Sequence, residues 1–266
     1  VSQSADPAEQ ESLLEQMAQI HDQLLEEPEE AIGLYREILS IDEASPVALK
    51  ALDELYARLE RHTELADNVE RQLSLASDPD EQTALMIRLA DLRETKMGEV
   101  ASAIEIYSEV LIQDESNAEA LAALERLLQT PDNELAVAEI LEPIYRNAGE
   151  VEKLIGVHEI QTRRASSPER RIELLHQIAE LYEVGLDNAS GAFEAMARAL
   201  AEDAGNLRTQ EELDRIGQLS GEMERLAQVY EARIEGLEDP HLVASLYTKA
   251  AQIREVYLDH AEIAIA

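Results

Sequence analysis

Four dipeptides, each a capping residue followed by proline, recur along the chain, and their spacing constrains the fold more than any other feature. In order, at separations of 72, 89 and 72 residues, they are Asp6-Pro7, Asp78-Pro79, Ser167-Pro168 and Asp239-Pro240. Asp or Ser before Pro is the pairing expected at a helix N-cap and first turn. Tyr35 and Tyr107 keep the same 72-residue register, and Leu124 matches Leu213 at 89. The chain is therefore predicted to be a tandem repeat.

Each block contains helical segments arranged in pairs. In the second block, Leu85, Leu89 and Leu92 are spaced to fall on one face of a helix over Glu81 to Arg93. Met97-Gly98 then provides a helix stop. The elementary unit is a helix pair of about 35 residues.

The register predicts seven helix pairs, the last of them truncated. Their ranges are 8–43, 45–77, 79–115, 133–166, 168–204, 206–238 and 240–266. The longer block has 17 extra residues, which predict one additional helix at 117–129. Pro143 should kink the helix that follows, because proline removes a backbone hydrogen bond. We expect a break in the array between 116 and 148, either as a bend shaped for a partner or as an insertion that only packs.

Composition excludes several functions. The chain has no cysteine, which rules out disulfides, thiolate catalysis and cysteine-ligated metals. Its 57 acidic and 22 basic residues give a net charge of -35, which disfavours binding to nucleic acid or anionic membrane. The charge is consistent either with a solvated surface that keeps the protein soluble or with attraction for a basic partner.

The chain is expected to be a soluble fragment of a longer protein. It begins at Val1 without methionine or a basic-then-apolar leader, and no apolar run is long enough to insert into a bilayer. The absence of cysteine suits cytoplasm and periplasm alike, and we favour the cytoplasm.

The repeated residues resemble the tetratricopeptide repeat (TPR) family in its degenerate, bacterial form. The motif residues of one copy are Leu89-Ala90, Gly98, Ala103-Ile104, Tyr107, Val110-Leu111 and Asp114. A second copy has Ile178-Ala179, Tyr182, Ala192-Phe193, Ala199-Leu200 and Asp203. The closing proline of the family is absent. The resemblance covers essentially the whole chain and implies an all-α, right-handed superhelical solenoid of about seven helix pairs plus one extra helix.

The resemblance also implies a binding surface. In TPR proteins the first helix of each pair lines a concave groove, and the family's ligand positions fall mostly on acidic residues here. The candidate partner-binding residues are Glu15, Asp22, Glu54, Ile87, Asp91, Glu94, Glu139, Glu173, His176, Glu180 and Glu183. The Lys and Asn clamp that chaperone-binding TPRs use for a carboxylate is represented only by Lys50, so that activity is not expected.

Two clusters have both a functional and a structural interpretation. His176 lies between Glu173 and Glu180, which should raise its basicity. The basic cluster Arg163, Arg164, Arg170 and Arg171 could receive an acidic partner, or could stabilise a helix end and pair with nearby Glu. We favour the second interpretation of the basic cluster.

The sequence contains no constellation for catalysis. Glu173 and His176 match one half of a carboxylate di-iron motif, but such sites need two copies and further inward Glu residues. Phosphate-binding loops, nucleophile elbows and zinc-protease motifs are absent from the sequence. No metal, cofactor or enzymatic activity is therefore expected.

The predicted function is a non-enzymatic protein-interaction scaffold that binds a basic peptide or a folded partner in an acidic concave groove. Such a partner could be a component of a larger bacterial assembly. The alternative is a structural spacer or oligomerisation rod whose ends dock onto neighbouring repeats. We expect a monomer or weak homo-oligomer.

Overall fold

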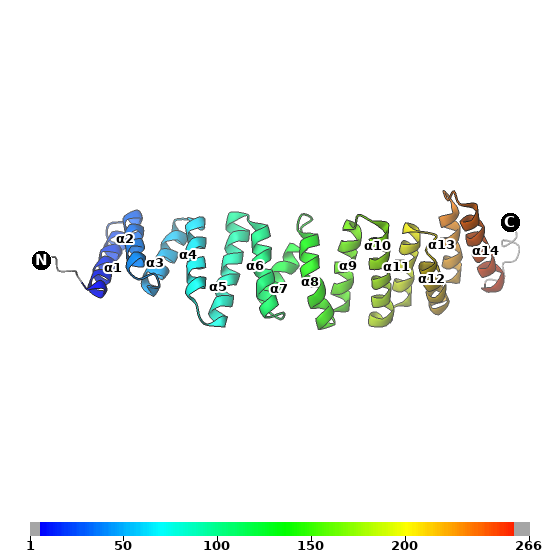
Figure 1. Ribbon diagram of the computed structural model, residues 1–266, viewed down its shortest axis with the longest axis horizontal. Helices are drawn as coiled ribbons and strands as arrows, with labels where there is room; N and C mark the ends of the chain where they lie inside the picture. Colours follow the sequence, from blue (N-terminus) through cyan, green and yellow to red (C-terminus); the bar gives the residue numbers. More distant parts are fainter. Residues whose placement is uncertain (1–5, 258–266) are drawn as a thin grey trace. The chain divides into compact units, whose positions relative to one another are not determined.

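The computed structural model describes residues 6–257, and this part consists of fourteen α-helices and two π-helical segments with no strand (Figure 1). The predicted all-α helical-repeat class is confirmed. Two compact units divide the chain, with the boundary between Arg126 and Leu127. This boundary falls inside the 116–148 range in which a break was expected. The single continuous superhelix and its handedness stay predictions.

The helices of the first unit follow one another as neighbours along the chain. Their bounds are α1 (Pro7–Gln23), α2 (Pro28–Ile41), α3 (Pro46–Arg58), α4 (His62–Leu75), α5 (Pro79–Leu92), the π-helix η1 (Arg93–Met97), α6 (Val100–Gln113) and α7 (Ala118–Leu127), whose last residue follows the boundary. Because contacts are made between sequential helices, each element is positioned by the elements before and after it.

The second unit has the same arrangement of sequential helices. Its elements are α8 (Glu134–Ala148), α9 (Val151–Arg164), α10 (Pro168–Glu180), the π-helix η2 (Leu181–Gly185), α11 (Ala189–Glu202), α12 (Leu207–Ser220), α13 (Met223–Ile234) and α14 (Pro240–Tyr257). Pro143 lies inside α8, which continues through it to Ala148.

The four recurring dipeptides begin helices as predicted. Pro7, Pro79, Pro168 and Pro240 are the first residues of α1, α5, α10 and α14. The preceding side chains accept hydrogen bonds from first-turn amides, for example Ser167 Oγ from the Arg170 N–H at 3.2 Å. These caps satisfy backbone donors that have no partner within the helix, and so fix where each pair starts.

The ends of α5 and α10 differ from the prediction. Gly98 does stop the helix, with a φ of 71° that favours glycine. Between α5 and that stop, however, η1 inserts one π-helical turn, and η2 occupies the corresponding place after α10. The sequence was expected to continue as ordinary α-helix to Arg93. These π turns change the direction of the side chains at Glu94 and Glu183, two candidate site residues.

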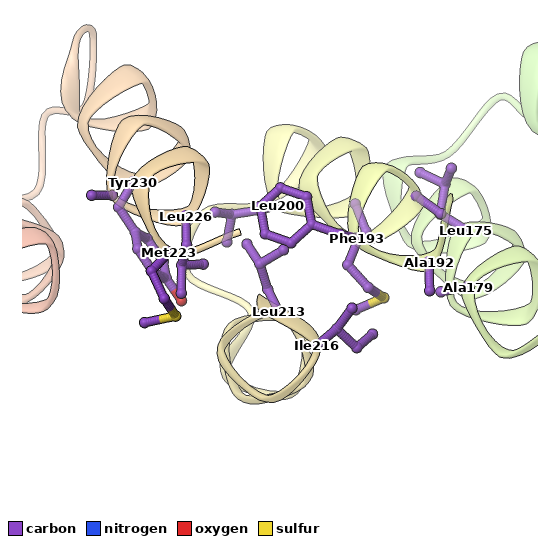
Figure 2. Close-up of a cluster of buried hydrophobic side chains, with 14 of the residues drawn as sticks. Leu175, Ala179, Ala192, Phe193, Leu200, Leu213, Ile216, Met223, Leu226 and Tyr230 are labelled. Atoms are coloured by element: carbon purple, nitrogen blue, oxygen red, sulfur yellow. The ribbon is translucent and has the colours of Figure 1, made fainter. Parts of the chain in front are cut away.

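The core of the second unit is a dry cluster contributed by every helix from α9 to α14. Phe193 of α11 is fully buried and lies among Leu200, Leu213 and Leu226 (Figure 2). Tyr230 is also fully buried, and its hydroxyl donates to Asp214 Oδ1 at 2.6 Å. Burial of this apolar surface holds successive helix pairs in register.

The first unit has a corresponding cluster built from α1 to α5. Ile38 and Val69 are fully buried there, and small residues such as Ala31 and Ala48 allow neighbouring helices to approach closely. The Ala- and Leu-rich composition therefore serves helix-on-helix packing, as the sequence indicated.

Candidate functional site

A pocket of about 630 Å³ lies between α10 and α12, and four candidate residues line it. Those four are Glu173, His176, Glu180 and Glu183. From α12, Arg208, Glu212 and Arg215 complete the rim, while Ala179, Met196 and Ile216 contribute apolar surface. We call this the α10–α12 pocket.

The sequence places these four residues together because they are separated by three or four positions along one helix, so they share a face. The opposite faces of α10 carry Leu174, Leu175 and Ile178, which are buried in the core. Burial of that apolar side against neighbouring helices leaves the charged side open to solvent.

Arg215 is held by two of the pocket's carboxylates. Its two Nη atoms donate to the two oxygens of Glu183, both at 2.6 Å, and its Nε donates to Glu212 at 2.9 Å. The hydrogen bonds from Arg215 lower the pKa of Glu183, and those from Glu183 raise the pKa of Arg215. The positive charge of Arg215 is therefore already compensated within the pocket.

The remaining carboxylates are more available. Glu180 is exposed, and the Glu173 side chain is 65% exposed, with Arg170 at 3.1 Å on its own helix. The rim thus carries four carboxylates against the two guanidinium groups of Arg208 and Arg215. An excess of negative charge in a partly enclosed hollow attracts cations.

His176 differs from the prediction. The pKa of His176 is lowered, mainly because the ring is partly buried and next because Arg208 is close; Glu212 opposes the change. Its Nε2 lies 2.9 Å from Thr209 Oγ1. The expectation of raised basicity considered only Glu173 and Glu180 on the same helix. It missed α12, which brings a cation and burial to the ring.

The first unit has an equivalent pocket between α5 and α7, of about 690 Å³. Ile87 and Asp91 line it, together with Arg88, Glu119 and Arg126. Its two carboxylates and two guanidinium groups are balanced, so this pocket lacks the excess of acid found between α10 and α12.

Glu94 extends from η1 toward Arg126, with Oε2 2.9 Å from Nη2. The hydroxyl of Tyr107 donates to the same oxygen at 3.4 Å. Burial, followed by Glu94 and Asp91, raises the pKa of Tyr107 to about 12. These candidate residues therefore surround a buried phenol and an arginine.

A third group lies around the hydroxyl of Tyr35, on α2. Burial raises the pKa of Tyr35, as do the nearby charges of Glu15, Asp22 and Glu54. Asp22 forms an ion pair with Arg58. Glu139 is exposed on α8, and it does not line the pockets described above.

Sequence reasoning missed a repeated ion pair that joins successive first helices. Glu94–Arg126 and Glu183–Arg215 are the same pair displaced by 89 residues. Arg88 pairs with Asp53 and Lys249 with Asp214, again between one first helix and the next. The signal was present in the 89-residue register, but it was examined for acids alone and not for their arginine partners.

The basic cluster is used within the chain. Arg163 and Arg164 both pair with Glu134 of α8, at 2.9 and 2.6 Å. Arg171 pairs with Glu202 at 2.6 Å and Arg170 with Glu173. The structural interpretation of this cluster therefore describes what these side chains do.

Two searches of the described part were negative. Between residues 6 and 257, no three His, Cys, Asp or Glu side chains converge as a metal site would require. No helix in the same range combines the length and apolar character needed to cross a bilayer.

Comparisons with known proteins found similarity to solved structures only. No family model matches the sequence, and no curated protein matches it. The TPR domain of P58(IPK) is 14% identical, with 93% of this chain and 66% of that chain covered and a TM-score of 0.37. A TPR protein from Parabacteroides merdae is 14% identical, with 96% and 91% covered and a TM-score of 0.33. PilF of Pseudomonas aeruginosa is 16% identical, with 97% and 90% covered and a TM-score of 0.29. This chain, like the two TPR proteins, is an all-helical repeat array.

Proposed function

We propose that this chain is a non-catalytic protein-interaction scaffold that binds a Lys- or Arg-bearing segment of a partner protein in the α10–α12 pocket. The observation that supports this proposal is a rim of four carboxylates around apolar surface from Ala179, Met196 and Ile216. A Lys or Arg side chain matches both parts, because its aliphatic stem packs on apolar surface while its head pairs with carboxylate.

Within the pocket, the entering cation would bind Glu173 and Glu180. Glu183 already forms a bidentate pair with Arg215, whereas Glu180 is exposed and Glu173 is bonded only to the exposed Arg170. The net charge of -35 would speed the approach of a basic segment, and the pocket would determine where it binds.

The proposal is narrower than an acidic surface along the whole chain. The pocket between α5 and α7 is balanced by Arg88 and Arg126, so it should contribute contact area more than attraction. The pairs Glu94–Arg126 and Glu183–Arg215 would fix the spacing of the first helices, and so the shape presented to the partner.

The test is a titration of fluorescein-labelled heptalysine, with heptaglutamine as the uncharged probe. The double variant Glu173→Lys/Glu180→Lys should weaken heptalysine binding about tenfold or more at moderate salt. The matched control is Glu105→Lys/Glu109→Lys on exposed positions of α6, which makes the same change in net charge.

If both double variants weaken binding equally, the attraction belongs to the overall charge and the proposed site is wrong. If the α10 variant binds as tightly as the parent protein, the site is also wrong.

A structural spacer is the second candidate function. It is favoured by an uncovered apolar face on α1, which is a different surface from the α10–α12 pocket.

A further inference from the structure

One side of α1 exposes three large apolar side chains. Leu13, Met17 and Ile20 are 59%, 40% and 46% exposed. Spacings of four and three residues place them in one stripe along the helix. The helix packs on α2, and its buried residues are Leu14 and Ala18. The stripe is therefore additional to the surface that holds α1 in the fold.

The repeat register identifies what this stripe corresponds to. Displaced by 72 residues, its members are Leu85, Leu89 and Leu92 of α5. Those three are at most 9% exposed. Helix α5 packs against α4, and the three belong to the same buried cluster as Leu65, Ala66 and Val69 of α4. The stripe on α1 is thus the surface that α4 covers one repeat later.

A polar residue beside the stripe follows the same rule. Gln82 Nε2 donates to the backbone oxygen of Ala76, the C-cap of α4, at 2.7 Å. At the corresponding place in the second unit, Arg171 donates to the oxygen of Ala165, the C-cap of α9, at 3.0 Å. Gln10 occupies this position on α1, and it is exposed.

The charges of α1 also suit a docked helix from an acidic repeat. Gln16 and Gln23, which flank the stripe, are exposed and uncharged. The carboxylates of Glu11 and Asp22 instead bond to Ser45 and Arg58, toward α3. A helix that approaches the stripe therefore meets little like-charge repulsion, although the chain as a whole is strongly negative.

We infer that the exposed face of α1 docks a partner helix with the chemistry of α4. That helix presents an apolar face spaced as Leu65, Ala66 and Val69, and its C-terminal carbonyl accepts a hydrogen bond from Gln10. The face is an end-to-end docking surface for another helix pair of this repeat type, and it acts separately from the α10–α12 pocket.

The test supplies such a helix to the full chain. A second copy of residues 43–77 is fused directly before Asp6, which reproduces the Ala76-Ser77-Asp78 connection because Asp6 corresponds to Asp78. Hydrogen–deuterium exchange is then followed at the α1 amides. The graft should slow their exchange about tenfold or more, since a covered helix opens less often.

Matched variants decide whether the stripe is responsible. With Met17→Glu/Ile20→Glu the graft should give no protection. With Ile112→Glu, at an 81% exposed apolar residue of the same unit, the protection should remain. Absence of protection in the parent, or equal protection in the stripe variant, overturns the inference. If the charged variant loses helix by circular dichroism, Met17→Gln/Ile20→Gln replaces it with the same expected outcome.

Sedimentation of the protein without the graft distinguishes the other occupant. A dimer that Met17→Glu/Ile20→Glu abolishes and Ile112→Glu preserves would identify a second copy on this face, and would overturn the proposed partner. A monomer in all three proteins agrees with the inference. Glu173→Lys/Glu180→Lys should leave the exchange result unchanged, so failure of the peptide-binding proposal and failure of this one are separable.

Discussion

At the scale of single residues, the contacts that matter most cross from one first helix to the next. His176 illustrates this, because its environment is set by Thr209 and Arg208 on α12 more than by its neighbours on α10. Residue types and spacing predicted which side chains would share a face. They could not predict the pKa of His176, since that depends on the distance between two helices 32 residues apart in the sequence.

The pKa of His176 in the folded protein should lie below its ordinary value of 6.5, measured by NMR titration of its ring protons. The unfolded chain then binds more protons, so this contribution to stability is present above about pH 6.5 and is lost as the pH falls through the lowered folded-state pKa. Arg208→Ala should raise the pKa and Glu212→Gln should lower it further. A native pKa above 6.5 would contradict the structure.

The Glu183–Arg215 pair should show a measurable coupling. In a double-mutant cycle with Glu183→Gln and Arg215→Ala, we expect a coupling of about 0.5–1 kcal/mol in urea unfolding, because the Arg215 side chain is half exposed and screened. The coupling should fall at about 1 M salt. The Glu94–Arg126 cycle should give a similar value, and a coupling of zero in both would exclude a structural role.

At the scale of elements, the helix starts were predictable and some of the ends were not. Capping residues before proline set α1, α5, α10 and α14 because a local hydrogen bond and a fixed φ suffice. The π turns η1 and η2 depend on how the end of one helix meets its neighbours, and no local signal announced them. The face of α10 that lines the pocket followed from periodicity, whereas its compensation by Arg215 did not.

Phe193 should carry a large share of the packing between α11 and its neighbours. It is fully buried among Leu200, Leu213 and Leu226 (Figure 2). Phe193→Ala should lower the free energy of unfolding by about 3–5 kcal/mol, measured by urea denaturation, because it removes buried surface and leaves a cavity. Leu219→Ala, at a 63% exposed position on α12, should change it by less than about 0.5 kcal/mol.

At the scale of the whole molecule, contacts pass from each helix to the next, and two compact units result. The repeat architecture was predictable because the register extends over the chain. The division at Arg126 and Leu127 corresponds to the 17 residues that interrupt the register, although the sequence alone left open what they would do.

A perturbation in such a chain should remain local. With Phe193→Ala, hydrogen exchange should accelerate across α10 to α13, whose buried residues share the Phe193 cluster, and should be unchanged in α2 and α3, which belong to the other unit. Amide exchange followed by mass spectrometry provides the measurement. Faster exchange in α2 and α3 would show that the chain unfolds as one cooperative body.

The recurrence of the same ion pair 89 residues apart has a consequence for how this protein can be rebuilt. Residues 79–126 and 168–215 run without a gap in register, and each begins at a capped proline and closes on the arginine that binds the acid of its π turn. They form two editions of one cassette. A chimera that exchanges them would keep both locks intact while it moves the acidic pocket into the first half of the molecule.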